Sequence, residues 1–142
     1  TLEQAPVNAK AACLYPNSAR ALNEVRERGF DNAVVLDALG NVAELATANL
    51  FMVKDGVVHT PYPNGTFLNG VTRQRAIALL RSAGYHVRER VIGYRELVEA
   101  DELFCSGNYS KGMPINRIED RDRQPGPVYQ RARDLYWEWA HA

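Results

Sequence analysis

Glu44 is an acid inside an otherwise apolar run, between Val42-Ala43 and Leu45-Ala46. A carboxylate among residues that favour burial must find a charged or hydrogen-bonding partner. Further along the chain, Gly70 opens an amphipathic pattern, and the free backbone N–H groups at the start of a helix bind anions. A buried acid beside an anion site suits a ligand that has a cationic ring nitrogen at one end and a phosphate at the other.

Pyridoxal phosphate fits this description, and an enzyme that uses it needs a lysine for the Schiff base. Lys10 is the candidate, within VNAKAACLY. The residues around Lys10 favour an ordinary surface lysine, because lysine is rarely buried. The case for a catalytic amine comes from the rest of the chain. Beside a cationic ring, a partly desolvated lysine has a depressed pKa and therefore a usable neutral amine.

Six segments carry a resemblance to a known family: AKAACLY, LDALGNVAELATANLF, VKDGVVHTP, FLNGVTR, ADELFCSGN and GPVYQRA. In this order they resemble the C-terminal, cofactor-binding half of the fold-type IV pyridoxal-phosphate enzymes, the superfamily of branched-chain and D-amino-acid aminotransferases. The resemblance implies an α/β (α+β) domain, a mixed, mostly antiparallel strand pseudo-barrel with flanking helices. It also implies one domain over residues 1–142, absence of the family's small N-terminal domain, and a homodimer. Residues 1–142 alone are therefore not expected to be a competent enzyme.

The same resemblance assigns the cofactor site. Lys10 would form the Schiff base and move the proton during transamination, and Glu44 would hold the proton on the pyridine nitrogen. The alternative for Glu44 is an ion pair with an arginine. Tyr15 would contact the phenolic oxygen of the cofactor, with a core aromatic as the equal alternative. Val71 and Thr72 would bind the phosphate through backbone N–H groups and the Thr72 hydroxyl, which is compatible with Thr72 being an N-cap.

The resemblance also assigns a substrate site. Asn108, Tyr109 and Ser110 stand where the family usually has Thr followed by two small residues, in a turn that binds the phosphate and the substrate carboxylate. Thr47 stands where branched-chain aminotransferases usually have Gly. A branched-chain L-amino acid with 2-oxoglutarate is the leading substrate pair. The departures at these positions favour a D-amino-acid or (R)-amine transaminase as the nearest alternative, and a 4-amino-4-deoxychorismate lyase on the same scaffold is a third. The expected absence of the N-terminal domain also leaves open a non-catalytic fragment or interaction module.

Composition narrows the classes of partner. The 142 residues are 46% hydrophobic, with 17 basic and 17 acidic side chains, so nothing indicates nucleic acid or an anionic membrane. No apolar run approaches the roughly 20 residues of a membrane span, and no signal peptide is visible, so we expect a cytoplasmic protein. Cys13 and Cys105 are expected to be reduced core thiols. The three histidines do not cluster, which predicts no metal site.

Hydrophobic periodicity and turn residues predict the elements that position these side chains. Residues 5–15 are expected to be extended or a tight turn, and the strands between residues 30 and 60 to form a meander in which neighbours pair antiparallel. In the helix over residues 70–83, Arg73 is expected to face water. Asn49 is expected to tie down the turn after Glu44. Helices are predicted over 19–28 (capped by Asn17 or Ser18), 70–83, 94–100 and from 127 onward; strands over 30–38, 48–53, 57–60, 85–92, 102–106 and 113–120.

Overall fold

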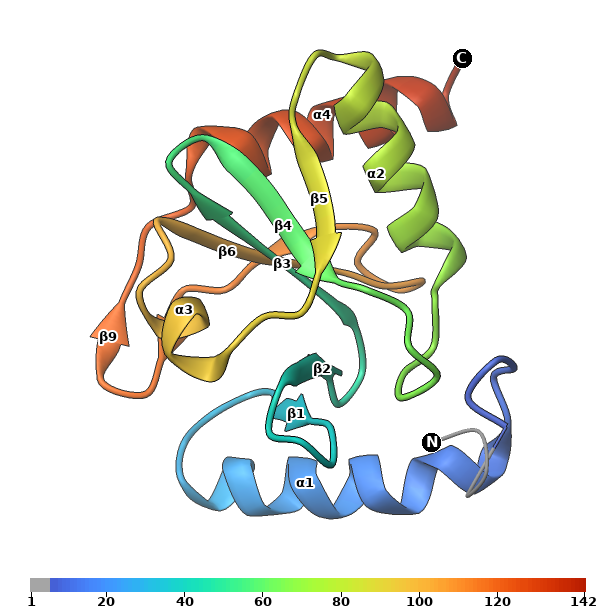
Figure 1. The fold of residues 1–142 in the computed structure, drawn as a ribbon, viewed down its shortest axis with the longest axis vertical. Helices are drawn as coiled ribbons and strands as arrows, with labels where there is room; N and C mark the ends of the chain where they lie inside the picture. Colours follow the sequence, from blue (N-terminus) through green and yellow to red (C-terminus); the bar gives the residue numbers. More distant parts are fainter. Residues whose placement is uncertain (1–5) are drawn as a thin grey trace.

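A five-stranded sheet in the order β5-β4-β3-β6-β7 forms the centre of the computed structural model, which describes residues 6–142 (Figure 1). Two smaller sheets pair β1 with β2 and β8 with β9. The strands are β1 (Val34–Leu36), β2 (Val42–Leu45), β3 (Asn49–Lys54), β4 (Val57–Pro61), β5 (Val87–Arg90), β6 (Glu102–Ser106), β7 (Met113–Pro114), β8 (Arg117–Ile118) and β9 (Arg121–Asp122). The helices are η1 (Ala12–Leu14, 3-10), α1 (Tyr15–Glu27), α2 (Val71–Ser82), α3 (Tyr94–Val98) and α4 (Pro127–Ala140).

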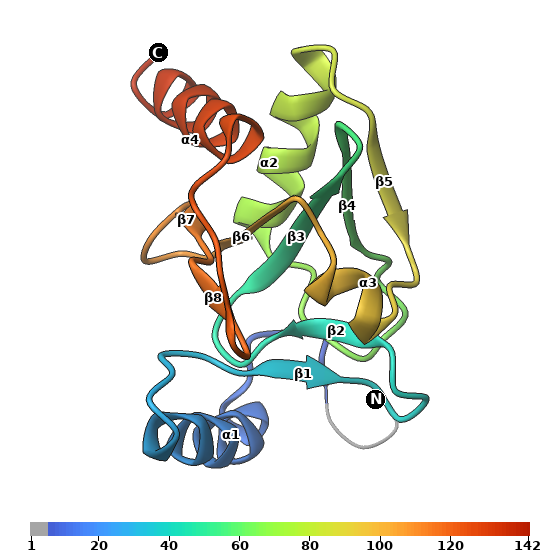
Figure 2. The same ribbon diagram turned by 90° about the vertical axis from the view of Figure 1, so that its left-hand side faces the viewer.

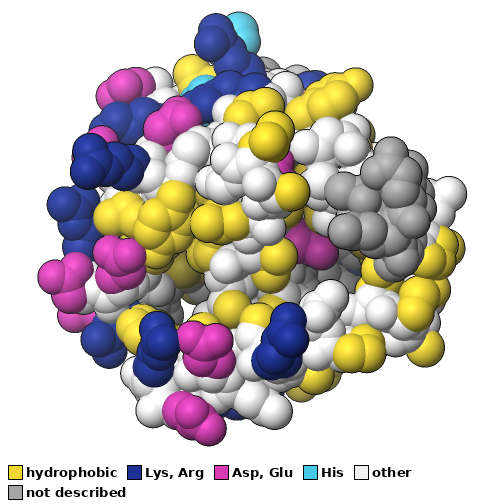
Figure 3. All heavy atoms as spheres, turned by 60° about the horizontal axis from the view of Figure 1, so that its bottom comes forward, with side chains coloured by type: hydrophobic (Ala, Val, Ile, Leu, Met, Phe, Trp, Pro, Cys, Tyr) yellow, Lys and Arg dark blue, Asp and Glu magenta, His cyan; other side chains and the backbone are white. Residues whose placement is uncertain are grey.

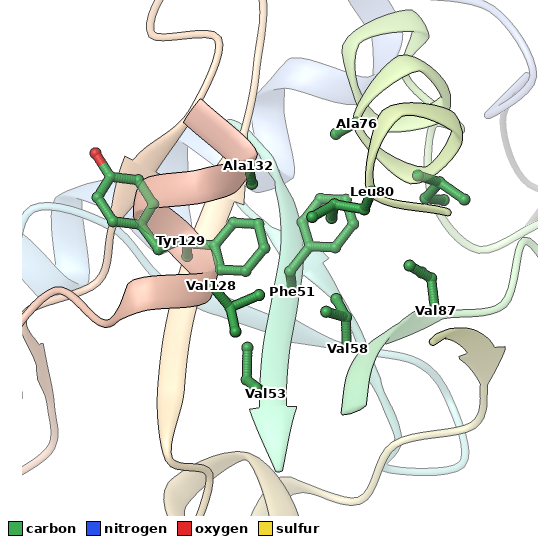
Figure 4. Packing of buried hydrophobic residues seen from close by; sticks show 11 residues of the cluster. Phe51, Val53, Val58, Ala76, Leu80, Val87, Val128, Tyr129 and Ala132 are labelled. Atoms are coloured by element: carbon green, nitrogen blue, oxygen red, sulfur yellow. The ribbon is translucent and has the colours of Figure 1, made fainter. Parts of the chain in front are cut away.

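Helices α2 and α4 cover one face of the central sheet (Figure 2). The side chains between them form one apolar core, part of which is drawn in Figure 4. Its centre is the stacked pair Phe51 and Phe104, from the adjacent strands β3 and β6, with ring centroids 4.9 Å apart and planes inclined by 2°. These contacts fix helix α2 over the sheet and so place its first turn.

Successive residues of a strand point to opposite faces of the sheet, and β3 follows this rule. Phe51 and Val53 join the core under α2 and α4, while Leu50 and Met52 join a second core on the opposite face. That second core also takes side chains from β2 and α3, including Val42 and Leu97. Because the sheet is buried on both faces, the strand residues of β3 and β6 are nearly all buried.

The strand β2 belongs to a hairpin with β1, and α1 lies against this hairpin at one end of the molecule (Figures 1 and 2). Gly40, in the turn between β1 and β2, has φ +82, a left-handed conformation that glycine adopts without a steric cost. Val35 lies opposite Glu44 in the register of the hairpin. The hairpin therefore fixes the backbone on both sides of this acid.

The mixed, mostly antiparallel sheet is as predicted, but the described strands do not close into a barrel. Among the strands between residues 30 and 60, β1 pairs with β2 and β3 with β4, both antiparallel as predicted. The pairing of β4 with β5, which that prediction did not cover, is parallel. The reason is that α2 lies between them in the chain and returns it in the same direction, as a helical crossover does. The other pairs of the central sheet are antiparallel.

Two segments differ from their predicted elements. Helix α1 begins at Tyr15, within the stretch expected to be extended, because Pro16 occupies its first turn, where a missing N–H costs nothing. No side chain caps α1, so the predicted caps were wrong. The single strand predicted over 113–120 is two short strands, since Pro114 lacks a donor for the sheet and Glu119 has a left-handed φ of 53.

The two thiols lie in different environments. Cys105 is buried in the second core, as predicted, and burial raises its pKa to about 11. Cys13 is exposed, so its assignment as a core thiol was wrong. Within residues 6–142, no helix has the length and apolar character needed to cross a bilayer, and no cluster of His, Cys, Asp and Glu has the geometry of a metal site.

Candidate functional site

Asn49, at the start of β3, joins the central sheet to the first turn of helix α2. Its side-chain Nδ2 donates to the Leu68 carbonyl at 2.8 Å, and its Oδ1 accepts from the Gly70 N–H at 3.2 Å. A Cβ atom at Gly70 would lie 2.5 Å from Asn49 Oδ1, so only glycine fits there. Asn49 therefore ties down the segment that leads into α2, and not the turn after Glu44 as predicted.

The first turn of α2 offers backbone donors. Gly70 is the N-cap, in an extended conformation with no side-chain cap, and the first backbone bond of the helix runs from Gln74 N–H to the Gly70 carbonyl. The N–H groups of Val71, Thr72 and Arg73 precede that bond and have no acceptor within the helix. Thr72 is thus inside the helix and is not its N-cap. Three amides without an acceptor among residues 6–142, together with the positive end of the helix dipole, give this turn the features that the predicted anion site requires.

A second turn lies at the same edge of the sheet. Ser106, the last residue of β6, is opposite Asn49 in the register of β3 and β6. The next residue, Gly107, packs on the segment before β3: a Cβ atom there would lie 3.7 Å from the Thr47 carbonyl oxygen and from Ala48 Cβ. The start of α2, the turn after β6 and Thr47 therefore meet around Asn49.

The predicted substrate residues lie in this turn after β6. Asn108 and Tyr109 are exposed, Tyr109 fully so, and Ser110 is partly buried. The Asn108 Oδ1 accepts from Lys111 Nζ at 3.1 Å, which leaves the amide Nδ2 of Asn108 free to donate. Lys111 holds the turn with a left-handed φ of 60 and a backbone bond to the Gly107 carbonyl at 2.9 Å.

Sequence reasoning missed Ser106 as a polar group of the site. Only 2% of Ser106 is exposed, and its Oγ finds no hydrogen-bond partner among residues 6–142. A buried hydroxyl without a partner costs about 1–3 kcal/mol. Its position in a predicted buried strand gave no sign of this, because strand patterns do not say which polar atoms are satisfied.

Glu44 is the most perturbed acid of the site. It lies in β2 between Ala43 and Leu45, both buried. No hydrogen bond or ion pair within residues 6–142 includes its carboxyl group, so the alternative of an arginine ion pair is wrong for this part of the chain. Burial raises the pKa of Glu44 to about 7. Glu44 is partly buried and has no countercharge among residues 6–142, so a cation placed beside its carboxylate would favour the charged form.

Lys10 and Tyr15 lie on the segment that enters α1. Lys10 is exposed and follows a turn closed by the Ala9 N–H to Pro6 carbonyl bond at 3.1 Å. Tyr15 is 51% exposed, so the alternative of a core aromatic is wrong. No hydrogen bond within the described residues joins Lys10 or Tyr15 to Glu44. The segment lies on the same side of the molecule as the loop that precedes α2 (Figure 1).

The face of the molecule that carries α1 and the β1–β2 hairpin has few charged side chains near its centre (Figure 3). Figure 3 brings this face forward, and most of the charged side chains lie around its upper, left and lower parts. The centre of the face is mainly hydrophobic and uncharged. A ligand bound there would be partly shielded from water, which strengthens its electrostatic contacts.

Comparison with known families matches residues 2–118 to amino-transferase class IV. The chain belongs to the class IV aminotransferases. It is 36% identical over 136 residues to the probable branched-chain-amino-acid aminotransferase of Aquifex aeolicus, covering 93% of this chain and 44% of that protein. The branched-chain-amino-acid aminotransferase of Escherichia coli K12 is 35% identical over 135 residues, again covering 93% and 44%.

Solved structures of class IV aminotransferases have the same fold. An aminotransferase from Brucella abortus, bound to its cofactor PLP, superposes with a TM-score of 0.97 at 60% identity, covering 99% of this chain and 50% of that one. The Escherichia coli branched-chain enzyme has a TM-score of 0.91 at 34% identity, covering 94% and 46%. The family and fold expected from the sequence motifs are confirmed, and the chain spans about half the length of these relatives.

Arg73 is the second residue whose place sequence reasoning missed. It was expected to face water, yet it is 1% exposed. Its spacing contained the signal, because residues 73, 76, 77 and 80 fall on one face of a helix, and Ala76, Ile77 and Leu80 are buried. The charge of Arg73 suggested exposure, whereas its position on the apolar face of the helix indicates burial.

Proposed function

We propose that the protein is a pyridoxal-phosphate-dependent aminotransferase that acts on a branched-chain L-amino acid with 2-oxoglutarate as acceptor. The observation that carries the proposal is Glu44, a partly buried carboxyl group in β2 with a raised pKa and no ion-pair partner among residues 6–142. Its place in the motif of a class IV aminotransferase matches that of the acid expected to meet the ring nitrogen. The printed names of the relatives support the substrate class.

The residues fit the cofactor at both of its ends. When bound, pyridoxal phosphate supplies an electron-withdrawing ring that stabilises negative charge at the substrate α-carbon. Glu44 would accept a hydrogen bond from the ring nitrogen and keep it protonated. The backbone N–H groups of Val71 and Thr72, with the Thr72 hydroxyl and the Asn108 amide, would bind the phosphate. Tyr15 would donate its hydroxyl proton to the phenolic oxygen.

Lys10 would attach the cofactor covalently. Once an amino acid substrate has displaced it, the freed amine would move a proton between the substrate α-carbon and the carbon that carries the amino group on the cofactor. Asn108, Tyr109 and Ser110 would orient the substrate carboxylate, and Thr47 would contact the rest of the substrate. A second substrate would reverse the steps, so the kinetics would be ping-pong. We also propose that the enzyme is a homodimer.

The second candidate is a D-amino-acid or (R)-amine transaminase. It is favoured by the side chains at Thr47 and Tyr109, where branched-chain enzymes are expected to have small residues. The Thr47 hydroxyl accepts from Asn32 Nδ2 at 2.7 Å, so its orientation is set before a substrate arrives. A fixed side chain at this position would change the shape that the substrate meets.

The cofactor assignment is tested on the full-length protein by adding pyridoxal phosphate, reducing with borohydride and mapping the modified lysine. We expect the label on Lys10 and no label in Lys10→Ala. Label on another lysine would overturn the site, and no binding at all would favour a non-catalytic module. Spectra of the first half-reaction with L-leucine, D-alanine and (R)-1-phenylethylamine then separate the substrate classes. Pyruvate release from 4-amino-4-deoxychorismate without an amino acceptor would identify the lyase.

A further inference from the structure

Arg73 is among the largest side chains that the fold buries completely, with 1% of it exposed. Its Nη1 donates to Asn69 Oδ1 at 2.7 Å. Its Nη2 donates to the Pro61 carbonyl at 2.8 Å and to Glu89 Oε1 at 3.0 Å. Its Nε lies 3.4 Å from Thr60 Oγ1. A single guanidinium thus joins the end of β4, the strand β5 and the segment before α2.

The position of this cation is unfavourable for the helix itself. Arg73 is in the first turn of α2, where the helix dipole disfavours positive charge, and that turn contains no acidic residue. Glu89 compensates only in part, because its other oxygen is 3.4 Å from Arg81 Nη2. Two guanidinium groups, one from the first turn of α2 and one from its last, thus share the carboxylate of Glu89, which leaves an excess of one positive charge around it.

The contacts of Arg73 hold the first turn of α2 from one side while Asn49 holds it from the other. Asn49 binds the Leu68 carbonyl and the Gly70 N–H, and Arg73 binds the side chain of Asn69 between them. The segment 68–70 is therefore fixed to β3 by one residue and to β4 and β5 by the other. Small errors in its path would turn the free amides of α2 away from a bound anion.

We propose that Arg73 is a positioning residue for the phosphate of the cofactor. It fixes the direction of the free amides of α2 and supplies positive charge behind them, without touching the phosphate itself. A buried cation in the first turn is a cost to folding that an anion at the helix N-terminus offsets. This inference rests on the proposed function, because it takes the first turn of α2 as the phosphate site.

The affinities of the full-length apoprotein for pyridoxal phosphate and for pyridoxal separate this role from a general role in folding. Pyridoxal lacks the phosphate. The dissociation constant of pyridoxal divided by that of pyridoxal phosphate therefore reports the contribution of the phosphate site alone. A variant that merely loosens the fold weakens both ligands and leaves their ratio unchanged. A variant that disturbs the phosphate site lowers the ratio.

Three variants make the test. Arg73→Lys keeps the charge but cannot reach Asn69, Pro61 and Glu89 together, and we expect it to lower the ratio by about tenfold. Asn69→Ala removes one contact of Arg73 at an exposed residue, so the fold is kept, and we expect a decrease of about threefold. The control Arg131→Met removes an exposed guanidinium of α4 that pairs with Glu138 and not with Glu89, and should leave the ratio unchanged.

The outcomes separate the two proposals. Ratios in Arg73→Lys and Asn69→Ala equal to that of the unmodified protein would overturn the positioning role and leave the cofactor assignment intact. If Arg73→Lys does not fold, Asn69→Ala decides by the same criterion. An unmodified protein that binds pyridoxal as tightly as pyridoxal phosphate would overturn the phosphate site itself, and the role of Arg73 with it.

Discussion

Replacing Glu44 by glutamine removes a charge that the fold partly buries. Burial raises the pKa of Glu44 from its ordinary value of 4.5 to about 7. The folded protein therefore holds the Glu44 proton between these two pH values, where the unfolded chain releases it. Because the folded pKa is the higher one, the free energy of unfolding falls as pH rises through this window. At about 1.4 kcal/mol per pKa unit, the loss is about 3 kcal/mol once pH exceeds 7.

Glutamine has no charge to lose, so Glu44→Gln should avoid this loss in the cofactor-free protein. We expect the variant to be more stable by about 3 kcal/mol at pH 8 and nearly equal to the unmodified protein at pH 4.5, where the carboxyl is protonated in the folded state and half protonated in the unfolded chain. Urea unfolding of the full-length apoprotein at these two pH values measures the difference. An equal effect at both pH values, or a less stable variant at pH 8, would refute the reasoning.

Asp37 is a matched control in the same hairpin. Burial tends to raise the pKa of Asp37, but hydrogen bonds from Asn41 and Leu39 outweigh it, and the pKa is lowered. A lowered folded pKa contributes stability that is present above the ordinary value of 3.8 and is lost as pH falls through the folded pKa. Asp37→Asn should therefore destabilise the apoprotein at pH 8, the opposite sign to Glu44→Gln.

The same Glu44→Gln change should reduce catalysis. An amide cannot hold the proton on a ring nitrogen as a carboxylate does, so the ring would lose most of its capacity to accept electrons. We expect kcat for transamination to fall by about a hundredfold or more, the scale on which single electrostatic contacts act in active sites. Higher stability with lower activity in one variant is the pattern of a residue kept for function.

Three further experiments test contacts within the fold and the burial of the two thiols. Glu102→Ala removes the acceptor for the first-turn amides of α4, and should lower the free energy of unfolding by about 2 kcal/mol in urea titrations. Gly70→Ala puts a Cβ atom 2.5 Å from Asn49 Oδ1, and should weaken pyridoxal phosphate binding more than pyridoxal binding. Of the thiols, exposed Cys13 should react with Ellman's reagent at pH 8, while buried Cys105, with its pKa raised to about 11, should not.

Each of these expectations has a contrary outcome. Unchanged unfolding of Glu102→Ala would mean that water replaces the carboxylate at the start of α4. Equal weakening of both ligands by Gly70→Ala would mean that the whole domain had shifted, and not the phosphate site alone. Rapid reaction of both thiols in the folded protein would contradict the burial of Cys105.

Elements with strong local signals were predictable from the sequence. The turn at Asp55-Gly56 needs left-handed backbone, with φ 49 and 75, and an Asp-Gly pair favours it. Helix α2 has an apolar stripe and ends before Gly84, whose φ is +89. The apolar run Glu102–Ser106 is a strand with the predicted bounds. In each case, the residues that determine the turn, helix or strand lie within a few positions of it in the sequence.

Features set by distant partners were not predictable in the same way. The parallel pairing of β4 and β5 depends on how α2 packs on the sheet, which no residue of either strand encodes. The burial of Arg73 depends on acceptors contributed by Pro61 and Glu89, remote from it in the sequence. Asn49 likewise bonds to a segment some twenty positions away, which only the folded chain brings near.

Glu44 and Arg73 are both charged residues in positions that disfavour their charge, one an acid and the other a base. The acid is partly buried with no ion-pair partner among residues 6–142, and the base is buried in the helix turn least suited to it. Neither placement favours folding by itself, since buried charges cost more than most contacts return. A ligand with a protonated ring at one end and a phosphate at the other would compensate both charges at once. Under the proposed function, these two charges would lie at and behind the two ends of one binding site.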